Sequence, residues 1–223
     1  MSLAGPDLRH VEHWVFDLDN TLYPPECEFM ALVEGRITDF VVRESGLPAA
    51  EALALQKRYL HEHGTSLAGL MAHHNVDPHR FLDEVHDVSL DALSPDPVLR
   101  LSLQNLPGRR LVFTNGSARH AERVLERLAI ADLFDDVFHL EAANLIPKPD
   151  PRTFQRMADR HGVAPRAAAF FEDTEKNLAP AAALGMTTVL VGPRAPLSTA
   201  DFVDHKTERL PDFLTGARTK EPA

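Results

Sequence analysis

The chain has 223 residues, 44% hydrophobic and 25% charged, a composition typical of a folded globular protein with one large domain or a domain carrying an insertion. With 23 Lys and Arg against 33 Asp and Glu, the net charge of -10 disfavours non-specific binding to a nucleic acid polymer or to an anionic membrane. No apolar run reaches the length of a membrane span, the N-terminus lacks a signal pattern, and the single cysteine, Cys27, excludes an internal disulfide, so we expect a cytoplasmic protein.

The first predicted element is a buried strand that ends in two aspartates. The apolar residues 14–16 lead into Asp17 and Asp19, and residues i and i+2 of an extended chain point the same way. In open α/β sheets, ligands bind at this end of the strands. Two carboxylates held together repel each other, and a hard divalent cation such as Mg²⁺ would relieve that repulsion. The alternative is an ordinary turn, in which Asp and Asn are common.

Residues 22–95 are expected to form a compact helical insertion. Apolar residues at helical spacing predict helices over 26–44 and 49–61, a short helix around 67–71, and a fourth that opens at 75–78 with a proline in its first turn. No convincing strand is expected between residues 24 and 94. The pattern therefore predicts a bundle of about four helices inserted after the first strand.

From residue 96 onward, strands and helices alternate. Strands are predicted over 110–114, 136–140, 167–171 and 187–191, and helices over 97–106, 117–128, 151–161 and 175–184. Such alternation with short loops predicts an α/β fold, a Rossmann-like parallel sheet with helices on both faces. We assign this core domain to residues 10–21 and 96–215, and we expect residues 216–223 to be a disordered polar tail.

Polar groups follow three of the predicted strands, and a lysine opens one of the predicted helices. In a parallel sheet these strand ends lie along one edge, so the groups should converge there. The unpaired N–H groups at a helix start also favour an anion near the lysine. The residues concerned are Asp17 and Asp19, Thr114-Asn115-Gly116, Lys148, and Glu172-Asp173.

This order of motifs resembles the haloacid dehalogenase-like (HAD) hydrolases, and the insertion resembles the helical cap of that family. The resemblance implies that Asp17 is a nucleophile that forms an aspartyl-phosphate and that Asp19 is the general acid and base. It also implies phosphate binding by Thr114, Asn115, Gly116 and Lys148, and a Mg²⁺ ion held by Asp17, the backbone carbonyl of Asp19 and Asp173, with Glu172 binding directly or through water.

Asp19 separates activities within that family. The dehalogenases lack an acid at this position, because a halide leaves without a proton, whereas the alkoxide of a phosphate ester needs one. The presence of Asp19 therefore favours a phosphatase over a haloacid dehalogenase. A phosphomutase stays open, because it uses the same groups.

A finer resemblance points to the pyrimidine 5′-nucleotidase branch of the family. It rests on the segments 17–24, 59–70 and 170–177. It implies hydrolysis of pyrimidine nucleoside monophosphates, with a phosphatase of sugar phosphates or similar small metabolites as the alternative. A non-catalytic binding module is disfavoured because it need not keep Asp19, and a dinucleotide oxidoreductase because no Gly-x-Gly-x-x-Gly follows a predicted strand. The oligomeric state is left open between a monomer and a weak dimer.

Within the insertion, the candidates for substrate contact are Tyr23, His63 and Thr65. Tyr23 comes just after the catalytic loop, although a hinge or packing role is a close alternative. The neighbouring pair His73 and His74 invites a metal-binding hypothesis. Adjacent residues on a helix point about 100° apart, however, so a surface or capping role is favoured for this pair.

Overall fold

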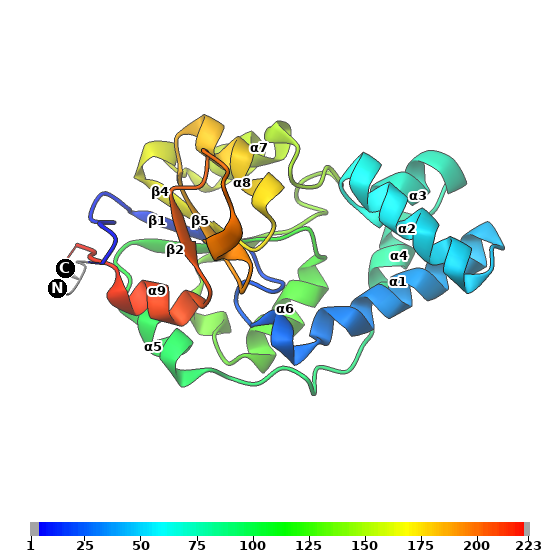
Figure 1. Cartoon of the computed structure of the whole chain (residues 1–223), viewed down its shortest axis with the longest axis horizontal. Coiled ribbons are helices and arrows are strands. Elements are labelled where there is room, and N and C mark those ends of the chain that lie inside the picture. Colours follow the sequence, from blue (N-terminus) through cyan, green and yellow to red (C-terminus); the bar gives the residue numbers. More distant parts are fainter. Residues whose placement is uncertain (1–4, 221–223) are drawn as a thin grey trace.

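The computed structural model describes residues 5–220 and contains one parallel sheet flanked by helices (Figure 1). The strand order is β3-β2-β1-β4-β5-β6, and every neighbouring pair of strands is parallel. Sequence order reverses at β1, so the carboxyl ends of β1 and β4 flank a topological switch point, where such sheets bind ligands. The strands are β1 (His13–Phe16), β2 (Arg109–Phe113), β3 (Asp136–Phe138), β4 (Ala168–Glu172), β5 (Thr187–Val191) and β6 (His205–Thr207).

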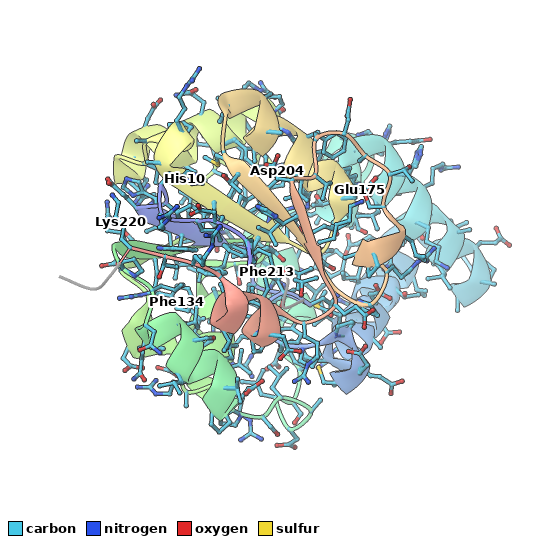
Figure 2. All side chains as sticks on the ribbon, turned by 60° about the vertical axis from the view of Figure 1, so that its left-hand side comes forward. His10, Phe134, Glu175, Asp204, Phe213 and Lys220 are labelled. Atoms are coloured by element: carbon cyan, nitrogen blue, oxygen red, sulfur yellow. The ribbon has the colours of Figure 1, made fainter. Side chains whose placement is uncertain are left out.

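Helices cover both faces of this sheet, because side chains alternate between the two faces along each strand. Trp14 and Phe16 pack with α5 (Pro97–Gln104), α6 (Ala118–Arg127) and α9 (Leu210–Gly216). Val15 packs with α7 (Pro151–His161) and α8 (Glu175–Leu184) on the opposite face. Phe134 and Phe213, partly buried, complete the first face (Figure 2). The predicted α/β fold is confirmed.

Between β1 and α5 the chain forms a separate cluster of four helices, which lies beyond the carboxyl ends of the strands (Figure 1). Tyr59 and Gly69 bring α2 and α3 together, since a Cβ on Gly69 would lie 2.3 Å from Cγ of Tyr59. This four-helix bundle comprises α1 (Phe29–Ser45), α2 (Ala49–His63), α3 (Ser66–His74) and α4 (Pro78–Val85).

Three features differ from the sequence-based expectations. Strand β3 ends at Phe138, and residues 139–140 turn away from the sheet. Strand β6 and helix α9 were not predicted, because a three-residue strand carrying His and Lys has no apolar pattern. The tail prediction is wrong for residues 216–220, since Arg218 forms a β-bridge with Asp7 and Lys220 pairs with Glu12 at 2.6 Å (Figure 2); residues 221–223 lie outside the described part. No helix in the described part is long and apolar enough to cross a membrane.

Candidate active site

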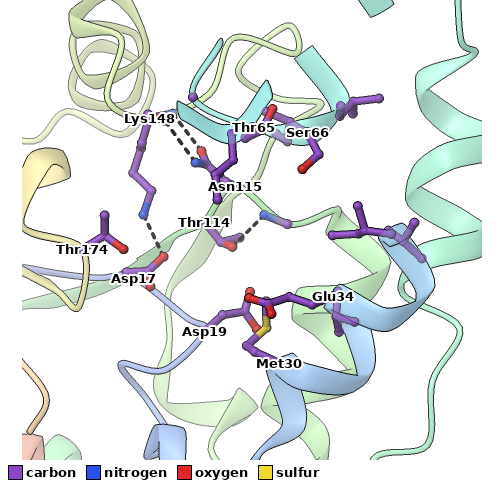
Figure 3. A pocket seen from close by; sticks show the side chains of 18 of the residues that line it. Asp17, Asp19, Met30, Glu34, Thr65, Ser66, Thr114, Asn115, Lys148 and Thr174 are labelled. Atoms are coloured by element: carbon purple, nitrogen blue, oxygen red, sulfur yellow. Dashed lines mark hydrogen bonds and ion pairs between the residues drawn. The ribbon is translucent and has the colours of Figure 1, made fainter. Parts of the chain in front are cut away.

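A buried ion cluster lies where β1 and β4 end. Lys148, on the loop that precedes α7, donates from Nζ to Oδ1 of Asp17 at 2.7 Å (Figure 3). The same Nζ donates to Oε2 of Glu172 at 2.7 Å and to the carbonyl oxygen of Phe113 at 2.8 Å. All three donor positions of this ammonium are therefore used. Lys148 is 1% exposed, so its charge is neutralised by the protein and not by water. The strand ends and Lys148 thus hold carboxylate and ammonium groups in fixed positions at the edge of the sheet.

Burial and charge set the protonation of this cluster. Burial raises the pKa of Asp17 and of Glu172 to about 7 and that of Asp173 to about 6; neighbouring carboxylates add to the rise, and Lys148 opposes it. Burial would lower the pKa of Lys148, but the carboxylates of Asp17 and Glu172 outweigh it and raise this pKa. Lys148 is therefore cationic. The raised pKa values of the three carboxylates reflect burial and mutual repulsion that one ammonium group does not offset, and a further cation would relieve that repulsion.

The same carboxylates form a candidate cation site. Within residues 5–220, Asp17, Glu172 and Asp173 are the group of three acidic, His or Cys residues whose ligand atoms lie within 4.8 Å of one another. All the donors are oxygens, which suits a hard divalent cation and not zinc, for which thiolate and imidazole ligands are more common. The group has three carboxylates and, in the described part of the chain, only one neighbouring ammonium group, that of Lys148, so the residues present fit a divalent metal ion.

The loop after β2 is shaped by its own side chains. Oγ1 of Thr114 accepts from the backbone N–H of Gly116 at 2.8 Å. The side chain of Asn115 brackets the backbone of Lys148: its Oδ1 accepts from the N–H at 2.8 Å, and its Nδ2 donates to the carbonyl at 3.2 Å (Figure 3). Asn115 thus holds the lysine loop with its side chain, and only its main chain is left to face an anion.

Asp19 lies beside Asp17 but has different partners. Its Oδ1 accepts from the hydroxyl of Tyr23 at 2.6 Å and from Nε2 of His120 at 2.9 Å. Burial would raise the pKa of Asp19, but the charge and hydrogen bond of His120, with the hydroxyl of Tyr23, lower it to about 2. No hydrogen bond from a described residue reaches Oδ2, which lines the cleft near Gly116.

A cleft of about 320 Å³ connects this sheet edge to the bundle. Met30 and Glu34 extend into it from α1, and Thr65 and Ser66 border it at the start of α3 (Figure 3). Most of its bundle wall is apolar, with the amide of Gln56 among the few polar groups. The apolar lining consists of Met30, Val33, Ile37, Leu60, Leu67, Phe81, Leu82, Val85 and Leu140.

The residues proposed for substrate contact fall in different places. Thr65 lines the cleft and caps α3 by accepting from the N–H of Ala68 at 3.1 Å. Tyr23 is 4% exposed and bonds to Asp19, so it supports the acid and does not line the cleft. His63 does not line the cleft either: its Nε2 lies 3.3 Å from Nε2 of His73 on the outer side of the bundle.

Two residues of the site were missed by the sequence reasoning. His120 stands four positions before the buried Val124 in a predicted amphipathic helix, so its place on the apolar face was a usable signal for burial. Gln56 is 6% exposed and close to Thr38, but nothing in the sequence separates it from an ordinary polar residue of α2.

Comparisons with known proteins agree with this geometry. A family model described as haloacid dehalogenase-like hydrolase matches residues 11–185. Phosphate metabolism protein 8 of Saccharomyces cerevisiae is 33% identical over 192 residues, which is 78% of this chain and 60% of that protein. Fructose-1-phosphate phosphatase YqaB of Escherichia coli is 33% identical over 123 residues, 52% of this chain and 63% of that protein. The chain thus spans less than two thirds of each relative's length.

Solved structures show the same fold at low identity. A HAD phosphatase from Thermococcus onnurineus superposes with a TM-score of 0.61 at 21% identity, covering 93% of this chain and 100% of that one. An L-2-haloacid dehalogenase from Xanthobacter autotrophicus superposes with a TM-score of 0.56 at 17% identity, covering 92% of this chain and 97% of that one. At these identities the likeness concerns the fold alone.

Proposed function

Because the chain belongs to the haloacid dehalogenase-like hydrolases, we propose that it is a Mg²⁺-dependent phosphatase that hydrolyses small phosphate monoesters through an aspartyl-phosphate. The observation that carries the proposal is the pairing of two unlike aspartates at one sheet edge. Asp17 is bonded to Lys148 on the floor of the cleft, and Asp19 keeps one carboxyl oxygen free beside it. A haloacid dehalogenase would have no use for that second carboxyl group.

The reaction has two steps in this proposal. A carboxylate oxygen of Asp17 attacks phosphorus, and the ester oxygen leaves with a proton from Asp19. These roles reverse the order of the two pKa values in the free protein, about 7 for Asp17 and about 2 for Asp19. A bound cation would lower the pKa of Asp17, and a dianionic substrate would raise that of Asp19. Asp19 then removes a proton from water, which attacks the phosphorus of the aspartyl-phosphate and releases inorganic phosphate. Lys148, the hydroxyl of Thr114 and the backbone N–H of Asn115 stabilise the charge on the phosphoryl oxygens. The N–H groups of Thr114 and Gly116 already donate to the carbonyl of Phe138 and to Oγ1 of Thr114.

The metal ion belongs to the same proposal. Asp17, Asp173 and the backbone carbonyl of Asp19 would hold Mg²⁺, which supplies positive charge to the phosphoryl group when bound. Glu172 has both oxygens engaged, since Oε2 accepts from Lys148 at 2.7 Å and Oε1 accepts from the N–H of Thr174 at 3.1 Å. Asp17 also accepts one hydrogen bond on each oxygen, from Lys148 and from Thr21 at 3.2 Å, and a carboxylate oxygen keeps a further lone pair beside such a bond. Glu172 would therefore contact the ion directly or through water.

For the substrate we propose a pyrimidine nucleoside 5′-monophosphate. The apolar bundle wall of the cleft supports a flat base over a polyol, whose hydroxyls would find few partners there. The amide NH2 of Gln56, whose Oε1 accepts from Thr38, would donate to the base edge. The carboxylate of Glu34, which also lines the cleft, disfavours a second phosphate on the substrate.

The alternative is a sugar phosphate, because one similar protein is named as a fructose-1-phosphate phosphatase. A phosphomutase would use the same sheet-edge groups. The two alternatives predict different products, since a mutase releases little inorganic phosphate.

The test is phosphate release from UMP, CMP, AMP, GMP and fructose 1-phosphate with saturating Mg²⁺. We expect kcat/KM for UMP and CMP to exceed that for AMP and GMP by ~10-fold or more, since a misfit of 1–3 kcal/mol has this effect. Equal values for purines and pyrimidines, or fructose 1-phosphate ahead of all four, would reject the nucleotidase assignment. Absence of phosphate release from every ester would reject the phosphatase itself.

A further inference from the structure

Two hydrogen-bond donors contact the same oxygen, Oδ1, of the proposed acid Asp19. Because an ionised carboxylate only accepts hydrogen bonds, Nε2 of His120 and the hydroxyl of Tyr23 must both carry their protons toward Oδ1. The two bonds measure 2.9 and 2.6 Å. Both donor side chains are buried, so water does not compete for them.

We propose that His120 and Tyr23 are positioning residues that hold Oδ1 of Asp19 so that Oδ2 faces the leaving-group oxygen. The proposal rests on the phosphatase function above, in which Asp19 gives and takes the proton. The terminal torsion of an aspartate is broad and weakly restrained, so the side chain alone does not fix which oxygen faces the cleft. Misplacement of an acid by about an ångström lowers the rate strongly. Two buried donors that fix the orientation of the carboxylate would therefore maintain the rate.

The two donors are themselves fixed by aromatic packing at the ends of the bundle. The ring of Tyr23 packs edge-on against Phe29, with the ring centroids 5.7 Å apart. The ring of His120 stacks on Phe29 at 6.0 Å and on His86 at 4.1 Å. Phe29 begins α1, and His86 directly follows α4. The donors to Asp19 are thus held by Phe29 and His86, which lie where the chain enters and leaves the bundle.

The exit point is also tied to the core. Arg123 of α6 donates to the carbonyl oxygens of His86 and Val88 at 2.9 and 3.1 Å, and Nδ1 of His86 lies 3.2 Å from Oγ of Ser117. His86 therefore keeps its stacking position over His120 through contacts with α6 and its N-cap. The acid is oriented by a connected set of core and bundle residues, and not by the catalytic loop alone.

The test compares two esters that differ in their need for an acid. UMP releases an alkoxide that must be protonated, whereas p-nitrophenyl phosphate releases a stable phenolate. The ratio kcat/KM reports the steps up to departure of the leaving group, so it isolates the first proton transfer. Tyr23→Phe and His120→Phe each remove a donor and keep a ring for packing against Phe29.

We expect each variant to lose ~10-fold or more in kcat/KM for UMP and much less for p-nitrophenyl phosphate, within the usual share of general acid catalysis. His120→Gln, which restores an N–H, should recover part of the loss. In an Asp19→Asn background, His120→Phe should cause no further loss on UMP, because it acts through Asp19. Tyr59→Phe is the matched control: it removes the buried tyrosine hydroxyl that bonds to His74 at 2.9 Å, and both esters should react as with the wild type.

Equal losses on the two esters, or a further loss in the Asp19→Asn background, would overturn the positioning role while the wild type still hydrolyses both esters. If the wild type releases phosphate from neither ester, the proposed function fails and this inference fails with it. Thermal unfolding of each variant separates loss of structure from loss of orientation.

Discussion

The sheet edge and the helical bundle meet at one cleft but are built on opposite principles. At the sheet edge, the buried ammonium group of Lys148 donates all three of its hydrogen bonds, to Asp17, Glu172 and a backbone carbonyl. The bundle wall is mostly apolar, and its polar groups include the exposed Glu34 and Gln56, whose Oε1 accepts from the hydroxyl of Thr38 at 2.7 Å. A charged, rigid edge suits a phosphoryl group that all candidate substrates share, whereas an adaptable apolar wall suits the part in which they differ. The difference indicates that chemistry and selection reside in separate regions, which can be altered separately.

The largest effect is expected from a substitution at Asp17, on the sheet edge. Asp17→Asn should reduce phosphate release from every ester to background, because an amide is a poor nucleophile and a weaker ligand for a cation. The measurement is kcat for UMP and for p-nitrophenyl phosphate, with the unfolding temperature as a control for folding. A variant with near wild-type kcat on either ester would remove the chemistry from the sheet edge.

Removal of divalent cations should have nearly as large an effect. After treatment with EDTA we expect activity on all esters to be lost together and restored by Mg²⁺, because Asp17, Glu172 and Asp173 exceed the charge of Lys148. Added Mg²⁺ should also raise the unfolding temperature of the apo protein, since it binds the folded state only. Full activity in EDTA, with no thermal shift on adding Mg²⁺, would contradict the assigned cation site.

A smaller and more selective effect is expected in the bundle. Gln56→Leu keeps the buried volume close to that of the amide and removes its polar atoms. It should lower kcat/KM for UMP by ~10-fold and leave p-nitrophenyl phosphate within about twofold, because only the base would contact the amide. Gln155→Leu, on the exposed side of α7, is the control and should change neither value. Parallel losses on both esters would show that the bundle also takes part in the chemistry.

The two regions also differ in how far the sequence predicts them. The convergence of Asp17 and Asp173 could be foreseen, because parallel strands end along one edge and the apolar runs mark those ends. Lys148 lies on the loop before α7, and its role was given by the family resemblance. The sixth strand could not, since His205–Thr207 takes its place from pairing with β5 and not from an apolar pattern.

Side-chain direction is the part that the sequence does not carry. Tyr23 was expected at the cleft, but the chain turns after Asp19 and folds the Tyr23 hydroxyl back onto the Asp19 carboxylate. The side chain of Asn115 holds the backbone of Lys148, so the predicted phosphate contact of Asn115 falls to its main chain. His63 was expected at the cleft and faces His73 instead, because the docking of α2 and α3 decides which side of the bundle it occupies. These outcomes depend on tertiary contacts between segments distant in sequence.

The most direct test of the central claim is to trap the phosphorylated enzyme. Asp19→Asn protein mixed with p-nitrophenyl phosphate and Mg²⁺, quenched rapidly in acid and digested, should carry a phosphoryl group on the peptide that contains Asp17. The label should accumulate because the base that activates water is missing. Phosphate release by the wild type, with the label on another residue or on none, would contradict the account.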